Sequence, residues 1–243
     1  MSEIQSFPDE TQLAQAAARS IIEFGLEKIG AQGRFTFVLS GGGTPAATYQ
    51  LLPDMADAQG LEWNKVFLLF GDERCVPPDH PESNYGMVQR SFIDQIDIPD
   101  RNVLPMLCTV SPEDAALAYE EKLRVLLTDH WDGRLDLILL GLGSDAHIAS
   151  LFPGSNALEE SSRLVLPTYV ENLDSWRLTL TPKAINSAER VFFLIQGDNK
   201  AKAVSHVFMN RYDPQRWPAQ VVRPEGGQVI WFMDQAAASR LDI

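Results

Sequence analysis

The stretch from Leu135 to Leu140 constrains the fold of this chain more than any other. It is apolar at every position except Asp136. An apolar run of this length is typical of a strand that is buried on both faces of a parallel sheet. We therefore expect helices to cover both faces of the sheet to which this strand belongs.

Strand and helix patterns alternate along the rest of the chain, as in successive βαβ units. One helix is predicted from Glu10 to Ile29, and another begins after Ser111, where Ser, Pro and Asp form a capping pattern. The other expected elements are strands at Phe35–Leu39, Val66–Phe70, Val103–Pro105, Arg177–Leu180, Arg190–Gln196 and Val229–Met233, and a helix at Asn199–Phe208. The prediction is one α/β domain over residues 1–243, with a mostly parallel, twisted, Rossmann-like sheet and helices on both faces.

A glycine-rich turn follows the Leu135–Leu140 strand and carries two groups suited to acid–base chemistry. Ligands of parallel sheets bind at the carboxyl ends of the strands, and Gly141 and Gly143 let the backbone turn just past that end. Asp145 and His147 should therefore emerge at the mouth of the sheet, where a catalytic base is wanted. The alternative is a loop histidine held by a backbone carbonyl.

Three consecutive glycines, Gly41 to Gly43, follow the Phe35–Leu39 strand. Thr44 and Pro45 are predicted to begin a helix, as its N-cap and first helical residue. Glycine amides at a helix N-terminus can converge on an anion, so the segment resembles a phosphate-binding loop in outline. It is neither a Gly-x-Gly-x-x-Gly motif nor a P-loop, which argues against dinucleotides and nucleoside triphosphates. A tight structural turn is the other interpretation.

Three cationic residues could supply a local pocket for an anion: Arg74, Arg177 and Lys200. The chain has 20 Lys and Arg against 33 Asp and Glu, a net charge of −13. This charge repels nucleic acid, anionic membranes and phosphorylated substrates over most of the surface, so a phosphorylated ligand needs such a pocket. Arg74 shares its turn with Asp72 and Glu73, but each cation alone could equally be a solvated surface charge.

Cys75 and Cys108 are too few for a disulfide framework or a four-ligand zinc site, and we expect Cys75 to be a small buried thiol. No pair of histidines has metal-ligand spacing, so acid–base chemistry without a metal or cofactor is predicted. The N-terminus lacks a signal-peptide pattern and no apolar run approaches about 18 residues, so a cytosolic location is expected.

Five segments between residues 40 and 203 resemble, in order, those of one family, the 6-phosphogluconolactonases. They are SGGGTP, GDERCVPPDHPESNY, GLGSDAHIASLFPG, RLTLTPKAIN and GDNKAKA, and the later WPAQVV and VIWFMDQAAA are also similar. The glycine-rich and Asp-x-His motifs are shared with the glucosamine-6-phosphate deaminases, which have the same α/β fold. DER followed by VP, and ASLFPG after the histidine, resemble the lactonase version; deaminases are expected to show AFNEPG at the second place.

The resemblance implies hydrolysis of 6-phospho-D-glucono-1,5-lactone to 6-phosphogluconate in the oxidative pentose phosphate pathway. It implies that His147 is the base for water and then the acid for the leaving ring oxygen, with Asp145 orienting the imidazole. The residues implied to hold the phosphate are Gly42, Gly43, Thr44, Arg74 and Lys200, and further candidate substrate-binding residues are Ser40, Gly41, Asp72 and Arg177. It implies no metal, cofactor, nucleic acid or membrane partner, and leaves the oligomeric state open.

One tripeptide departs from the family pattern, which usually reads Asp-Gly-His where this chain has Asp145, Ala146 and His147. Ile148, in place of the usual threonine, is a milder change. If Ala146 needs φ > 0, the strain costs on the order of 1 kcal/mol and could displace His147. We expect a negative φ, because a strained alanine would have to be held by surrounding structure that the sequence does not reveal.

Two other functions stay open. The first is an aldose–ketose isomerase that deaminates glucosamine 6-phosphate, which the segment after His147 and an ammonia assay would distinguish. The second is a non-catalytic sugar-phosphate sensor, which would be expected to carry a fused module such as a helix-turn-helix. The fold predicted here begins within the first dozen residues.

Overall fold

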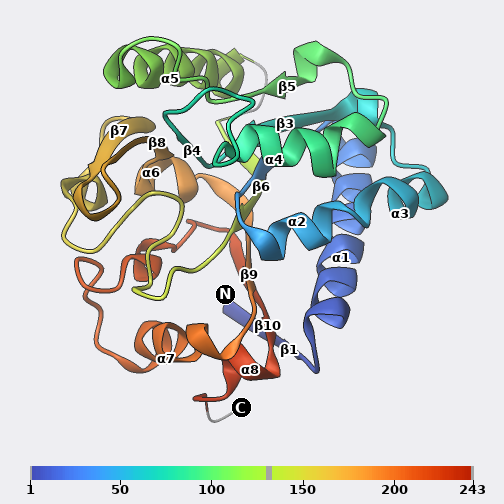
Figure 1. Cartoon of the computed structure of the whole chain (residues 1–243). Coiled ribbons are helices and arrows are strands. Elements are labelled where there is room, and N and C mark those ends of the chain that lie inside the picture. Colours follow the sequence, from blue (N-terminus) through green and yellow to red (C-terminus); the bar gives the residue numbers. More distant parts are fainter. Residues whose placement is uncertain (1, 130–132, 242–243) are drawn as a thin grey trace.

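A computed structural model of the chain describes residues 2–129 and 133–241. Its main sheet has seven strands: β1 (Ser2–Phe7), β2 (Phe35–Leu39), β3 (Val66–Phe70), β5 (Val103–Leu104), β6 (Leu135–Leu140), β9 (Ala188–Ile195) and β10 (Gln228–Asp234). Their order is β1-β10-β9-β6-β2-β3-β5, and each neighbouring pair is parallel (Figure 1). The predicted α/β class with a mostly parallel sheet is confirmed.

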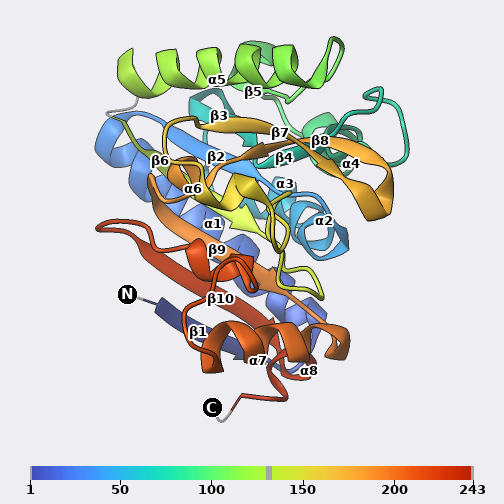
Figure 2. The same ribbon diagram turned by 90° about the vertical axis from the view of Figure 1, so that its left-hand side faces the viewer.

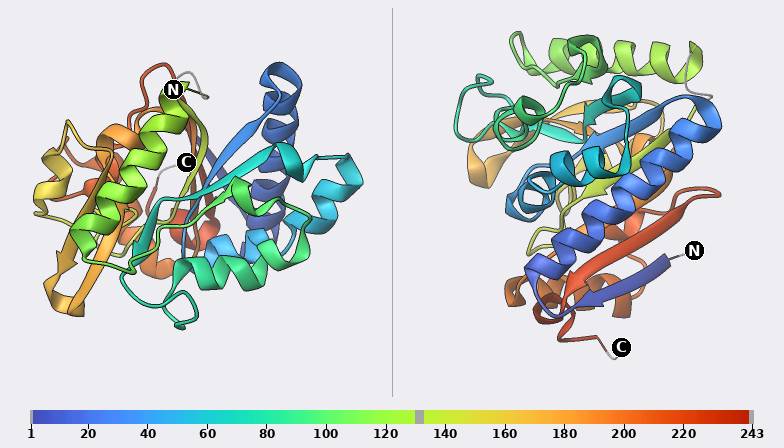
Figure 3. Two further views of the ribbon diagram at one scale, coloured as in Figure 1. Left: turned by 90° about the horizontal axis from the view of Figure 1, so that it is seen from above. Right: turned by 90° about the vertical axis from the view of Figure 1, so that its right-hand side faces the viewer.

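Helices cover both faces of this sheet (Figures 1 and 3). One side carries α1 (Glu10–Gln32), α2 (Gly43–Tyr49), α3 (Leu52–Gln59) and α4 (Asn84–Ser91). The other side carries α6 (Pro182–Ile185) and α7 (Ala201–Met209), with α8 (Gln235–Ala238) packed against α7. No helix within residues 2–129 and 133–241 is long and apolar enough to cross a membrane.

A second, smaller sheet was not predicted. It consists of β4 (Asp72–Arg74), β8 (Ser175–Leu180) and β7 (Val165–Val170), in that order and antiparallel. The predicted strand Arg177–Leu180 therefore exists but does not join the main sheet, because the turn at Asp174, with φ 44°, folds it back on β7 as a hairpin. Figure 2 shows this sheet in front of the main one, beneath α5 (Pro112–Asp129).

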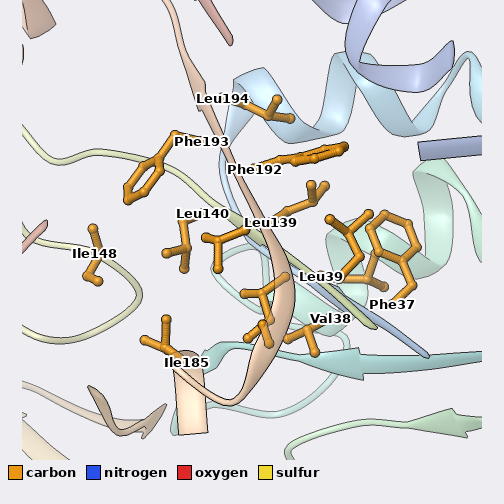
Figure 4. Close-up of a cluster of buried hydrophobic side chains, with 14 of the residues drawn as sticks. Phe37, Val38, Leu39, Leu139, Leu140, Ile148, Ile185, Phe192, Phe193 and Leu194 are labelled. Carbon is orange, nitrogen blue, oxygen red and sulfur yellow. The ribbon is translucent and has the colours of Figure 1, made fainter. Parts of the chain in front are cut away.

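The core lies where β2, β6 and β9 meet the helices. Every residue of β2 and β6 is buried, and Figure 4 shows side chains of β2, β6 and β9 in one cluster with Ile148 and Ile185. The one polar residue of the predicted run, Asp136, is also buried, and its carboxylate accepts hydrogen bonds from the amide (2.7 Å) and hydroxyl (2.9 Å) of Thr36. The polar exception is therefore satisfied inside the sheet.

Local signals located most of the other elements. Helix α1 begins at the predicted Glu10, with Asp9 as N-cap, and the capping pattern before α5 is confirmed because the amide of Asp114 donates to the hydroxyl of Ser111. Strand β1 was missed, since four of its six residues are polar and its partner β10 is far away in sequence.

The expectation for the cysteines was wrong. Cys75 and Cys108 form a disulfide, with Cα atoms 5.0 Å apart and a sequence separation of 33 residues. The bond joins the residue that follows β4 to the connection between β5 and α5. The fold brings together two half-buried cysteines whose proximity no local pattern in the sequence indicates.

Candidate functional site

The main sheet has a switch point between β2 and β6. From β2 the chain builds outward through β3 to β5, and from β6 it builds in the opposite direction through β9 to β10. The segments that leave the carboxyl ends of both strands are rich in glycine and flank a cavity of about 480 Å³. Parallel sheets of this type bind ligands at such a point.

Every predicted site residue except Asp145 lines this cavity. The residues are Ser40, Gly41, Gly42, Gly43, Thr44, Asp72, Arg74, His147, Arg177 and Lys200. They come from the segments that follow β2, β6 and β9 of the main sheet, and from β4 and β8 of the small sheet. The structure therefore brings these candidates together around one cavity. Asp145 lies outside the lining but contacts the imidazole of His147.

The imidazole of His147 is held by Asp145. Its Nδ1 lies 2.6 Å from Oδ1 of Asp145, and the amide of His147 donates to the same oxygen at 3.2 Å. A carboxylate beside Nδ1 favours a proton on that nitrogen and leaves Nε2 as an acceptor. Burial acts to raise the pKa of Asp145, but the charge and hydrogen bonds of His147 outweigh it and lower that pKa.

The turn that carries this pair is tightly closed, and its backbone overturns one expectation. Ala146 has φ 66°, so the predicted negative φ was wrong. The amide of Ala146 donates to the carbonyl of Gly143 (3.0 Å), its carbonyl accepts from the amide of Ala219 (3.0 Å), and its side chain is fully buried. The left-handed conformation is thus fixed by contacts on both sides.

A glycine is required at position 143 because the side chains of Asp145 and His147 lie directly against its backbone. Its amide donates to the carbonyl of His147 at 2.8 Å. A Cβ at this position would lie 2.1 Å from Nδ1 of His147 and 2.5 Å from Oδ1 of Asp145. Any side chain here would therefore push the imidazole from its place.

The glycine segment after β2 differs slightly from the prediction. Gly42, with φ 107°, is the N-cap and α2 begins at Gly43, so the expectation that Thr44 is the N-cap was wrong. The positive φ of Gly42 turns the chain into the helix earlier than the Thr-Pro pattern suggested. Gly41 allows a close approach, because a Cβ there would lie 1.9 Å from Oδ1 of Asn84.

Two arginines lie side by side on neighbouring strands of the small sheet. Arg74 of β4 is the register partner of Arg177 of β8. Both Nε atoms are buried and have no hydrogen-bond partner within residues 2–129 and 133–241. Burial, and then the charge of Arg74, lower the pKa of Arg177. Two adjacent guanidinium groups in a cavity favour an anion between them, and Lys200, which follows β9, lines the same cavity.

Two buried carboxylates fix the chain around the loop that follows Arg74. Buried Glu73 accepts from the amides of Asn84 and Tyr85, each at 2.7 Å, and burial raises its pKa in spite of these bonds. Buried Asp72 accepts from the hydroxyl of Ser150 at 2.7 Å and from the Asn84 side chain at 3.1 Å. The chain entering and leaving the loop after Arg74 is thereby fixed.

Sequence reasoning missed several residues of the cavity wall: Asn84, Ala149, Gln196, Gly197 and Asn199. Three of them follow β9, whose carboxyl end lies beside that of β6, and the glycine after a predicted strand was a usable signal there. Asn84 gave no such signal, because it reaches the site from the start of α4.

No group of three or more His, Cys, Asp and Glu side chains that could hold a metal ion occurs in the part of the chain that the structure describes.

Known proteins resemble this chain over nearly its whole length. A family model for glucosamine-6-phosphate isomerases and 6-phosphogluconolactonases matches residues 8–231. A 6-phosphogluconolactonase of Synechocystis is 41% identical over 88% of this chain and 87% of its own. One of Nostoc is 37% identical over 99% of this chain and 98% of its own.

Solved structures agree. A 6-phosphogluconolactonase from Trypanosoma cruzi superposes with a TM-score of 0.88 at 29% identity, covering 100% of this chain and 98% of its own. One from Trypanosoma brucei has a TM-score of 0.86 at 30% identity and covers 99% of both chains. The chain belongs to the family of glucosamine-6-phosphate isomerases and 6-phosphogluconolactonases.

Proposed function

We propose that the protein is a 6-phosphogluconolactonase, which hydrolyses 6-phospho-D-glucono-1,5-lactone to 6-phosphogluconate in the oxidative pentose phosphate pathway. The observation that carries the proposal is that His147, held by Asp145, lines the same cavity as the Arg74–Arg177 pair. The names of relatives that match over most or nearly all of the chain support it.

In this proposal the cations bind the phosphate. Arg74 and Lys200 hold it together with the amides of Gly42 and Gly43 and the hydroxyl of Thr44, all of which line the cavity. Arg177 contributes a second guanidinium beside Arg74. Charge-assisted bonds of this kind fix one end of the substrate, so that the lactone carbonyl is presented to the imidazole. Ser40, Gly41 and Asp72 line the same cavity. In this proposal they contact the sugar ring.

His147 then transfers the proton. With its Nδ1 proton directed at Asp145, Nε2 accepts a proton from water as that water attacks the lactone carbonyl. The tetrahedral intermediate collapses with cleavage of the bond between the carbonyl carbon and the ring oxygen. The imidazolium returns its proton to that oxygen, which restores neutral His147, and Asp145 stabilises the transient charge. Every step uses side chains of this chain, and the proposal includes no metal or cofactor.

The decisive assay follows freshly generated lactone and, in parallel, ammonia release from glucosamine 6-phosphate. We expect lactone hydrolysis without ammonia, and expect activity to survive exhaustive chelation. His147→Ala should fold and lose about a hundredfold or more in rate, the usual scale for removing a general base. Ammonia release, full activity of the variant, or activity that depends on an added divalent metal would each contradict a stated part of the proposal.

A further inference from the structure

The imidazole of His147 has a second neighbour that the proposed reaction does not use. The ring of Phe152 lies over it, with ring centroids 4.3 Å apart and planes tilted by 32°. The His147 side chain is otherwise 32% exposed. One face of the imidazole is therefore covered by an apolar surface while Asp145 holds its edge.

Phe152 is placed by a hydrogen-bonded loop. The amide of Leu151 donates to the carbonyl of Ile148 at 2.8 Å and begins the turn that brings the chain back over His147. The amide of Gly154 then donates to the carbonyl of Gln215 at 2.8 Å, which ties the far side of the turn to the chain between α7 and β10. A ring on a loop fixed at both ends keeps its position relative to the imidazole.

The Phe152 ring lies close to side chains of one cavity and lines another. His147 and Arg177 line the cavity of about 480 Å³, whereas Phe152 lines a neighbouring one of about 740 Å³ beside the hairpin of β7 and β8. The guanidinium carbon of Arg177 lies 6.0 Å from the Phe152 centroid.

We infer that Phe152 is a positioning residue that acts through His147. The ring blocks rotation of the imidazole toward the second cavity and so keeps Nδ1 on Asp145 and Nε2 in the first cavity. This inference rests on the proposed function for its kinetic consequence, but the imidazole geometry it describes exists without substrate. Because displacement of a reacting group by about 1 Å can cost on the order of a hundredfold in rate, such a role is measurable.

The experiment compares Phe152→Ala with Phe152→Tyr, which retains the ring. Nitrogen-15 NMR of the imidazole in the substrate-free protein reports which nitrogen carries the proton. We expect Phe152→Ala to lose the preference for Nδ1–H and to lower kcat about ten- to a hundredfold, with KM changed by less than about twofold. Phe152→Tyr should keep both the Nδ1–H preference and kcat close to the wild-type values. Tyr169→Ala is the matched control, since it removes an aromatic ring from the second cavity and should change neither.

Three results would overturn the inference: an unchanged tautomer in Phe152→Ala, an effect confined to KM, or the same loss in Phe152→Tyr or Tyr169→Ala. If Phe152→Ala does not fold, Phe152→Leu replaces it with the same expected directions. The NMR measurement keeps the inference separate from the proposed function, because a wild-type protein inactive on the lactone would contradict only the latter.

Discussion

At the scale of single residues, the left-handed backbone of Ala146 should have a measurable effect on the free energy of unfolding. Alanine at φ 66° is strained by roughly 1 to 2 kcal/mol, which glycine would avoid. Loss of the buried methyl group and greater freedom of the unfolded chain offset part of this gain. We expect Ala146→Gly to raise the free energy of unfolding by up to about 1 kcal/mol, measured by thermal denaturation.

Ala236→Gly is the control for that substitution. Ala236 is exposed within helix α8, where glycine should destabilise by about 0.5 to 1 kcal/mol. The two substitutions should therefore shift Tm in opposite directions, and a fall in Tm for both would mean that the Ala146 conformation carries no net strain.

The cations of the cavity should determine the preference for a phosphorylated substrate. We expect Arg74→Ala and Lys200→Ala each to reduce the ratio of kcat/KM for the phosphorylated lactone to that for gluconolactone, by about ten- to a hundredfold. This range corresponds to about 1.5 to 3 kcal/mol for a charge-assisted contact. Lys202→Ala, an exposed cation two residues after Lys200, should leave the ratio unchanged. An unchanged ratio in both site variants would place the phosphate elsewhere.

At the scale of elements, helix α5 is joined to the small sheet by one buried carboxylate. Glu120 accepts from the amide of Leu164 (2.9 Å) and pairs with Arg124 (2.6 Å) and Arg163 (3.0 Å). Burial acts to raise the pKa of Glu120, but these bonds outweigh it and lower that pKa. A lowered folded-state pKa stabilises the fold above the ordinary pKa of a glutamate, and the contribution is lost as pH falls through the folded-state value.

Glu120→Gln should accordingly destabilise the protein by about 1.5 to 3 kcal/mol at pH 7, the range for hydrogen bonds to a charged group. The difference from wild type should shrink as the pH falls below the ordinary titration range of a glutamate, because the wild-type carboxylate also becomes protonated there. Urea denaturation at pH 7 and at acidic pH measures this. Glu121→Gln, at an exposed neighbouring position, serves as control, and a pH-independent difference would show that the charge of Glu120 is not what matters.

The elements also show how far sequence reasoning extends. The bounds of β2, β3 and β6 match the predicted ranges, because each is a short apolar run that ends at a turn. Residues after β2 and β6 that line the cavity were predicted for the same reason. Asn84, the Cys75–Cys108 bond and the φ of Ala146 were not, since each depends on a contact with a segment far away in sequence.

At the scale of the whole molecule, the Cys75–Cys108 disulfide links the residue after β4 to the connection between β5 and α5. With a separation of 33 residues, constraint of the unfolded chain is worth about 3 to 4 kcal/mol. Reduction with dithiothreitol should therefore lower Tm by several degrees. The Cys75→Ser/Cys108→Ser double variant should have the Tm of the reduced protein with or without reductant, and equal stability of oxidised and reduced wild type would contradict the prediction.

The pairing of β1 with β10 has a consequence for how the chain matures. Residues 2–7 are synthesised long before residues 229–234, with which they pair in the main sheet. Strand β1 must therefore wait unpaired while the intervening strands and helices are made, and the edge of β10 is covered by a contact of very large sequence separation. Pairing at this edge of the sheet is thus expected to be a late step of folding.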